Sequence, residues 1–202
     1  MRCIIIGNGS YDNFFDIKPD DFVICADGGY NYAVKFNITP DCIIGDMDSV
    51  KTDISGKETV VYPREKDYTD GELAVRLAIE KGFGNIVLLG MTGSRLDHTI
   101  GNIFLLRMIC KSGLSGFLAD RKNTVYYTDG SISLSSVKGK TISLMPLGGD
   151  LLNVSNNGLY YPLRGETLLF GSTRGISNVA VSDDIKISFD SGEAAVIVTS
   201  GE

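Results

Sequence analysis

The hydrophobic positions of the first 120 residues form short apolar runs that alternate with helical patterns. The runs at 1–6, 22–26, 42–44, 60–63 and 86–89 are typical of buried strands. The segments 69–81 and 97–110 instead repeat apolar residues at helical spacing. Thr69 and Glu72 form a capping-box pattern, and Gly82 and Gly113 follow the two segments. Strands that alternate with helices predict a parallel α/β sheet.

The pattern changes near residue 120. Short apolar strands are expected at 124–127, 132–134, 141–144, 167–170, 185–189 and 195–198, and turns such as Asp129-Gly130 separate them. No helical pattern occurs in this half. The sequence therefore predicts an N-terminal α/β domain with a parallel sheet over 1–120, followed by an all-β C-terminal sandwich over 121–202.

Four of the apolar runs lead into acidic or phosphate-type motifs. These motifs are Asp27-Gly28-Gly29, Gly45-Asp46-Met47-Asp48-Ser49, Lys66-Asp67-Tyr68-Thr69-Asp70 and Thr92-Gly93-Ser94-Arg95. Ligands bind beyond the carboxyl ends of strands in an open parallel sheet, so we expect the motifs to converge on one cleft. Two carboxylates about 4 Å apart repel by roughly 1 kcal/mol in water. A Mg²⁺ ion, which takes carboxylate oxygens and bridges phosphates, would offset that repulsion.

Composition narrows the function classes. The chain has 202 residues and a net charge of −6, which argues against a broad nucleic-acid-binding surface. The first apolar run is too short for a signal peptide, and no run has the length of a membrane span. The four cysteines form no C-x-x-C pair and are expected to be buried thiols. Together these features predict a cytoplasmic protein without a membrane partner.

Each motif also has an ordinary structural interpretation. At the end of a strand, Asp46 and Asp48 would bind one metal ion. Alternatively, both belong to a polar loop with ordinary surface acids. Thr69 and Asp70 begin a helix, where exposed N–H groups favour anions, yet a simple helix cap explains them too. The Gly93–Arg95 segment suits phosphate binding but lacks the ending of a P-loop. The single histidine, His98, is expected to be structural.

Two segments of the C-terminal half carry candidate ligand contacts. Residues 157–162 contain Tyr160 and Tyr161, which would offer an aromatic wall to a flat ring. Residues 172–178 form a polar loop rich in hydrogen-bonding groups. Read alone, each segment is also typical of a loop in a β-sandwich.

Taken together, the motifs resemble the thiamine pyrophosphokinase family. The matching segments keep their order over nearly the whole chain: 26–29, 45–49, 65–70, 93–98 with Asn102, and 158–163 with 177–178. The resemblance implies transfer of a diphosphoryl group from ATP to the thiamine hydroxyl, which yields thiamine diphosphate and AMP. It also implies a homodimer, with thiamine held where the α/β domain of one subunit meets the sandwich of the other.

The resemblance assigns roles to residues. It implies Mg²⁺ ligands at Asp46, Asp48 and Asp70 and catalytic roles for Asp48, Asp67, Asp70, Arg95 and Asp97. The nucleotide side would comprise Asn8, Asp27, Gly28, Lys66, Thr69, Thr92, Gly93, Arg95 and Asn102. The thiamine side would comprise Asp97, Tyr161, Ser177 and Asn178. We expect Lys66 and Arg95 to neutralise phosphoryl charge, and either Asp67 or Asp97 to orient the hydroxyl and accept its proton.

Three positions depart from the family pattern. Met47 stands where many relatives carry an aromatic residue, and Ser94 replaces a common glycine. Tyr161 stands where some relatives carry tryptophan, and the chain contains no tryptophan. The last change is expected to weaken stacking on the thiamine ring.

Other functions fit parts of the sequence. One alternative is another Mg²⁺-dependent phosphotransferase or phosphohydrolase, in which Asp46 is a covalent nucleophile. That class would place a second acidic pair after a parallel strand, whereas Asp183-Asp184 lies in the all-β half. A second alternative is a thiamine- or nucleotide-binding module without turnover, in which Asp48→Asn would alter affinity alone. A purely structural protein would leave the carboxylates after strands unexplained.

Overall fold

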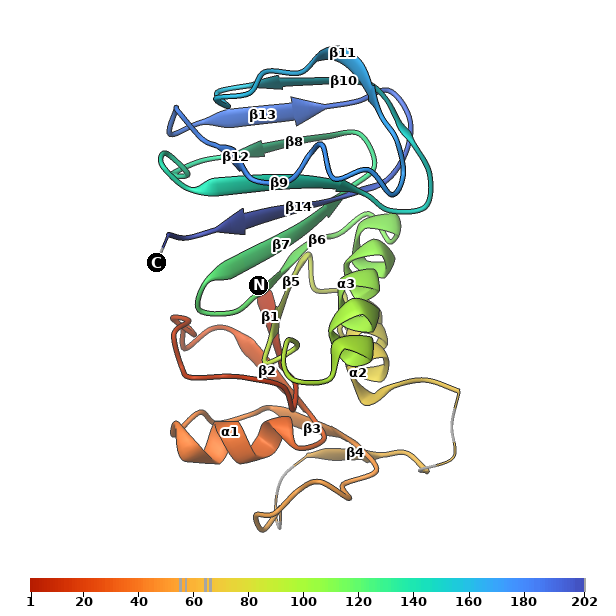
Figure 1. The fold of residues 1–202 in the computed structure, drawn as a ribbon. Coiled ribbons are helices and arrows are strands. Elements are labelled where there is room, and N and C mark those ends of the chain that lie inside the picture. Colours follow the sequence, from red (N-terminus) through yellow and green to blue (C-terminus); the bar gives the residue numbers. More distant parts are fainter. Residues whose placement is uncertain (55, 57, 64, 66, 202) are drawn as a thin grey trace. The chain divides into compact units, whose positions relative to one another are not determined.

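The computed structural model describes residues 1–54, 56, 58–63, 65 and 67–201 (Figure 1). The chain divides into two compact units, Met1–Arg121 and Lys122–Glu202. Within the described ranges, no helix has both the length and the apolar character needed to cross a membrane.

The first unit contains a parallel sheet with the strand order β6-β5-β1-β2-β3-β4. Every neighbouring pair is parallel. The strands are β1 (Arg2–Ile6), β2 (Phe22–Ala26), β3 (Cys42–Gly45), β4 (Thr59–Val61), β5 (Asn85–Leu89) and β6 (Ser115–Ala119). Because all of them run the same way, the loops that follow them leave from one edge of the sheet.

Helices cover both faces of this sheet (Figure 1). On one face, Tyr30 and Ala33 of α1 (Gly29–Lys35) cluster with Ile4, Ile6 and Val23. Helix α2 (Asp70–Glu80) contacts β1, β2 and β3 and packs beside α3 (Leu96–Lys111). Strands covered on both sides bury nearly every side chain, which explains why the sequence shows continuous apolar runs rather than alternation.

Helix α2 begins as the sequence predicts, with one difference. The Thr69 hydroxyl oxygen accepts a hydrogen bond from the Glu72 N–H at 3.2 Å. The Glu72 carboxylate, however, accepts hydrogen bonds from Arg76 at 2.8 and 3.0 Å. Of the two hydrogen bonds in the predicted capping box, the one from the Glu72 N–H to the Thr69 hydroxyl is therefore present. The Glu72 side chain binds Arg76 in place of the Thr69 backbone.

The second unit has two antiparallel sheets, ordered β12-β9-β14-β7 and β11-β10-β13-β8. Val154, Ile185, Ile187 and Val196, which come from both sheets, share one hydrophobic cluster. Its described residues contain no helix. The strands are β7 (Asn123–Thr128), β8 (Ser131–Leu134), β9 (Thr141–Pro146), β10 (Leu151–Asn157), β11 (Arg164–Leu168), β12 (Asn178–Val179), β13 (Ile185–Ser188) and β14 (Ala194–Thr199).

The sequence missed four elements: α1, β6, β10 and β12. Helix α1 has only 7 residues and begins at the second glycine of the pair Gly28-Gly29, so its helical pattern is weak. Strand β10 pairs with β11 through shifts of register, which disrupt the alternation of apolar and polar residues. The strand expected at 167–170 is observed at Arg164–Leu168. Of the cysteines expected to be buried, Cys3, Cys25 and Cys42 are buried and Cys110 is half-buried.

Candidate active site

The loops that follow the parallel strands surround one cavity of about 520 Å³ in the first unit. This size suits a small-molecule ligand. The loops after β2, β3 and β5 and the start of α2, whose motifs the sequence analysis expected to converge, all line this cavity, and the loop after β1 joins them. The lining includes the predicted site residues Asn8, Asp27, Asp46, Thr69, Asp70, Thr92, Gly93, Arg95 and Asn102.

Three carboxylates form the acidic part of this site. Oxygen atoms of Asp27, Asp46 and Asp48 lie within 4.8 Å of one another. Asp27 is only 9% exposed, so its charge is poorly solvated. Charges at such separations repel by about 1 kcal/mol in water and by several times more at lower dielectric. A set of hard oxygen donors at this spacing fits a divalent cation such as Mg²⁺.

The backbone at two positions of this cluster has an unusual conformation. Asp27 has φ 47° and Met47, between Asp46 and Asp48, has φ 65°. Residues with side chains adopt this left-handed region at a cost, and such outliers concentrate at functional sites. The Asp27 N–H donates to the Ile44 carbonyl at 2.8 Å, which holds the strained turn in place.

Gly45 allows two aspartates to approach the end of β3. Its φ of +146° favours glycine, and a Cβ there would lie 3.1 Å from Asp27 Cβ and 3.2 Å from Asp70 Cγ. Asp70 lines the cavity but is not one of the three clustered carboxylates. The structure thus groups Asp27 with Asp46 and Asp48, whereas the sequence analysis placed Asp27 on the nucleotide side and Asp70 among the metal ligands.

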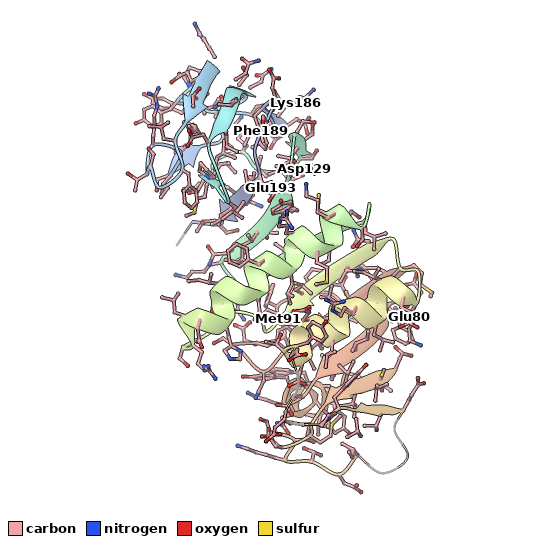
Figure 2. All side chains as sticks on the ribbon, turned by 90° about the vertical axis from the view of Figure 1, so that its right-hand side faces the viewer. Glu80, Met91, Asp129, Lys186, Phe189 and Glu193 are labelled. Atoms are coloured by element: carbon pink, nitrogen blue, oxygen red, sulfur yellow. The ribbon has the colours of Figure 1, made fainter. Side chains whose placement is uncertain are left out.

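The glycine-rich loops on the other side of the cavity pack tightly. A Cβ on Gly9 would lie 2.2 Å from the Thr92 carbonyl oxygen, and one on Gly28 would lie 2.4 Å from Asn8 Cγ. Asn102 of α3 donates from Nδ2 to the Met91 carbonyl at 2.8 Å. Figure 2 shows Met91 beside the helices of this unit, and its side chain packs toward Gly71 at the start of α2. These contacts fix the loops around the cavity.

Arg95 and Asp97 form an exposed ion pair at the start of α3. Arg95 Nη2 lies 2.5 Å from Asp97 Oδ2, and Nε lies 3.3 Å from Oδ1. The hydrogen bond from Arg95 lowers the pKa of Asp97 below its ordinary value. A carboxylate with a lowered pKa is a weaker proton acceptor. This geometry therefore favours a role for Asp97 in orienting Arg95 over a role as general base.

Asp67 is exposed and does not line the cavity, and Lys66 lies outside the described residues. His98, which we expected to be structural, lines the cavity together with Tyr68 and Thr99. The sequence analysis gave no role to Tyr68, although it lies within the 66–70 motif, or to Thr99, because neither carries a charge and each lies near residues with a clearer chemical role.

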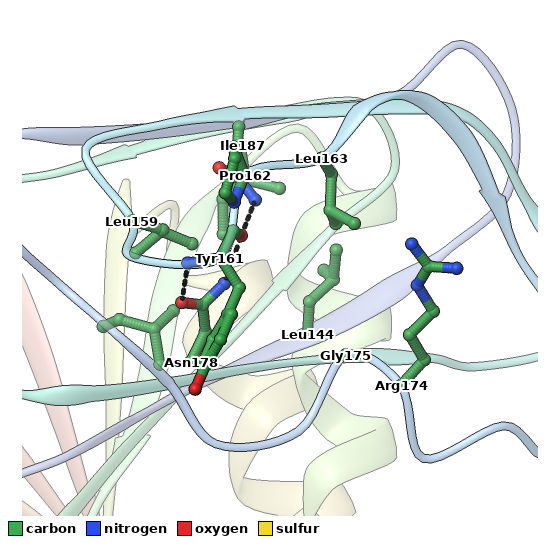
Figure 3. A pocket seen from close by; sticks show the side chains of 11 residues that line it. Leu144, Leu159, Tyr161, Pro162, Leu163, Arg174, Gly175, Asn178 and Ile187 are labelled. Carbon is green, nitrogen blue, oxygen red and sulfur yellow. Dashed lines mark hydrogen bonds between the residues drawn. The ribbon is translucent and has the colours of Figure 1, made fainter.

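The second unit has its own pocket of about 330 Å³, drawn in Figure 3. Tyr161 and Asn178 line it and are joined by two hydrogen bonds: the Tyr161 N–H donates to Asn178 Oδ1 at 2.9 Å, and Asn178 Nδ2 donates to the Tyr161 carbonyl at 2.7 Å. Leu144, Leu159 and Ile187 supply apolar walls. Ser177 does not line this pocket, and its N–H donates to Ser143 Oγ at 3.1 Å.

Sequence comparisons identify relatives along both units. Residues 17–118 match the family model for the thiamin pyrophosphokinase catalytic domain, and residues 130–193 match the model for its vitamin B1 binding domain. The thiamine pyrophosphokinase of Bacillus subtilis is 32% identical over 84% of this chain and 83% of its own length. Thiamin pyrophosphokinase 1 of Caenorhabditis elegans is 28% identical over 80% of this chain and 72% of its own.

Solved structures agree with these matches. The crystal structure of the Bacillus subtilis thiamine pyrophosphokinase matches with a TM-score of 0.89 at 26% identity, over 100% of both chains. That of the Geobacillus thermodenitrificans thiamin pyrophosphokinase gives 0.88 at 27% identity, over 100% of this chain and 99% of the other. The matched family models, the sequence relatives and the fold all point the same way, and the chain belongs to the thiamin pyrophosphokinase family.

Proposed function

We propose that the cavity of the first unit binds ATP and transfers its terminal diphosphoryl group to the hydroxyl of thiamine. Thiamine pyrophosphokinase activity follows from family membership, with ATP as co-substrate. The observation that carries the assignment to this cavity is that Asp27 and Asp46, two of the three clustered carboxylates, line one space together with glycine-rich loops. Transfer of phosphoryl groups needs positioning and charge stabilisation, and these two features supply both.

We propose that the aspartates at the sheet edge hold Mg²⁺. Asp27, Asp46 and Asp48 offer the closest oxygens, and the Asp70 side chain lies next to Gly45, as that of Asp27 does. A Mg²⁺ ion held by these residues would supply positive charge that offsets the negative charge of the ATP phosphates. The affinity of this site for Mg²⁺ is expected to depend on both Asp46 and Asp48, because both residues directly follow strand β3.

The remaining residues orient the reactants. The thiamine oxygen forms a bond to the β-phosphorus, the bond from that phosphorus to the bridging oxygen of AMP breaks, and the hydroxyl proton passes to Asp67, the candidate base that remains once Asp97 is engaged with Arg95. Arg95, held by Asp97, faces the charge that builds on AMP. Asn8 and Gly93, which line the cavity, are proposed to lie against the phosphates of ATP.

We propose that the two units have separate roles, with an α/β domain for ATP and Mg²⁺ and a C-terminal sandwich for thiamine. Tyr161 and Asn178 support this because both line the pocket of the second unit. The family resemblance supports a homodimer in which two subunits complete each site. The three buried cysteines support a reducing, cytoplasmic location.

The test is release of AMP from ATP and Mg²⁺, measured with and without thiamine. Wild-type protein is expected to release AMP only when thiamine is present. Asp48→Asn should lower this rate by roughly a hundredfold or more, as removal of a main electrostatic contributor does. Asp20→Asn, a change of an exposed aspartate away from the cavity, is the matched control and should keep the rate. Release of AMP without thiamine would contradict the proposal.

A further inference from the structure

Tyr68 lines the cavity of the first unit and is 43% exposed, and it is the one described residue of the 67–70 stretch to which the sequence analysis gave no role. The Arg76 guanidinium carbon lies 4.4 Å from the centroid of the Tyr68 ring. One face of the ring is thus covered by a cation, and the rest of its exposed surface is available to an occupant of the cavity. Aromatic rings placed in this way are stacking surfaces for flat ligands.

The position of Arg76 is itself fixed. Glu72, four residues earlier on α2, accepts hydrogen bonds from Arg76 Nε and Nη2 at 3.0 and 2.8 Å. This bond raises the pKa of Arg76 above its ordinary value. In a complete capping box the Glu72 side chain would instead return to the backbone of Thr69. Glu72, Arg76 and Tyr68 therefore form a supporting chain that ends at the cavity.

The packing of Tyr68 also differs from what its place in the sequence predicts. The residue before a helix N-cap often packs on the fourth helical residue, here Leu73. Leu73 is buried in the unit, whereas the Tyr68 ring lies under Arg76 at the cavity. The Tyr68 hydroxyl makes no hydrogen bond to a described residue. The ring itself, rather than the hydroxyl, is the part of Tyr68 that this arrangement presents.

We propose that Tyr68 is the stacking surface for the adenine of ATP and that Arg76 is the positioning residue that holds its ring. This proposal rests on the proposed function, since it needs ATP in this cavity. The charge behind the ring selects the ligand: a cation near one face repels the positively charged thiazolium of thiamine and leaves neutral adenine as the suitable partner. Stacking of a base on an aromatic ring is tolerant of base identity but stronger for purines.

The test is direct binding of AMP, without turnover, to Tyr68→Leu and Tyr68→Phe. Tyr68→Leu is expected to raise the Kd of AMP by roughly tenfold, in line with stacking contributions per base. Tyr68→Phe should restore most of the affinity, because it keeps the ring. In the wild type, the fluorescence of ethenoadenosine monophosphate should be quenched on binding, and Tyr68→Leu should remove that quenching. Phe170→Leu, an exposed aromatic in the second unit, is the matched control.

Arg76 is tested through the ring that it holds. Arg76→Met is expected to raise the Kd of AMP by about two- to fivefold, as loss of an exposed cation–π contact does. The Kd of CMP should change less, because the smaller base stacks more weakly. A purely structural role would weaken AMP and CMP equally and would overturn the assignment of Arg76.

The outcomes separate the proposal from the function on which it rests. If Tyr68→Leu binds AMP as the wild type does, or loses thiamine affinity instead, the stacking proposal is wrong while the proposed function stands. If the wild-type protein binds no AMP, both are wrong. If Tyr68→Phe binds as weakly as Tyr68→Leu, the ring is not the recognising group and the proposal is overturned.

Discussion

The replacement Gly45→Ala tests how the sheet edge builds the carboxylate site. Gly45 ends β3 with φ +146°, a conformation that a residue with a side chain adopts at a cost of about 1–3 kcal/mol. The added Cβ would also meet Asp27 Cβ at 3.1 Å and Asp70 Cγ at 3.2 Å, which is closer than ordinary van der Waals contact. The two carboxylates would have to move apart.

The expected result follows from both effects. Backbone strain should lower the free energy of unfolding by about 1–3 kcal/mol. Displacement of the carboxylates should lower kcat/KM by roughly a hundredfold, since small misplacements near a reacting centre have effects of that size. Urea unfolding measures the first quantity. Thiamine-dependent AMP release measures the second, and Mn²⁺ binding followed by electron paramagnetic resonance reports on the metal site without turnover.

Gly82→Ala is the matched control. Gly82 also has positive φ, +79°, but nothing lies within 4 Å of the Cβ that alanine would add. It follows the C-cap of α2, so its replacement should cost about 1 kcal/mol of stability and leave kcat/KM and Mn²⁺ binding intact. If Gly45→Ala lost stability but kept wild-type activity and Mn²⁺ affinity, the crowding argument would be refuted. Equal losses of activity in both variants would also refute it.

Three further predictions follow from the charges. Asp48→Asn should raise Tm in EDTA by relieving repulsion within the cluster, and it should abolish the rise in Tm that Mg²⁺ gives the wild type; a thermal scan measures both. Burial raises the pKa of Cys3 and Cys25 from 9.0 to about 12. The contribution of the two protonated thiols to the free energy of unfolding is therefore complete below pH 9 and is lost between pH 9 and 12. Urea unfolding should show about 1.4 kcal/mol less stability per thiol at pH 10 than at pH 8, and equal stability would contradict this. Asp97→Asn should lower kcat/KM by about tenfold while the pH–rate profile keeps its shape, because the carboxylate orients Arg95; a profile that loses its acid limb would identify Asp97 as the base instead.

The sequence predicted the strand ends of the first unit well, because a strand buried on both faces has to be apolar and its following loop has to be polar. It could not predict which aspartates share one space. Asp27 and Asp46 belong to neighbouring strands, and their proximity depends on the register Ala26 to Ile44. The role of Gly45 depends on a backbone angle that composition does not reveal.

Residues without charge or special shape were the hardest to predict. Tyr68 is one tyrosine among nine, and its place over the cavity depends on Glu72 turning away from the helix cap. In the second unit, the bonds between Tyr161 and Asn178 join positions 17 residues apart, which no local pattern indicates. Strand β10 was missed because its register shifts remove the alternation on which strand prediction depends.

The central claim is that a diphosphoryl group moves as a unit from ATP to thiamine. The most direct measurement is a ³¹P NMR time course of the wild-type protein with ATP, Mg²⁺ and thiamine, in which every phosphorus-containing product is identified. The account predicts that AMP and thiamine diphosphate appear together in equal amounts, without ADP. Formation of ADP with thiamine monophosphate, or of ADP with inorganic phosphate, would contradict it.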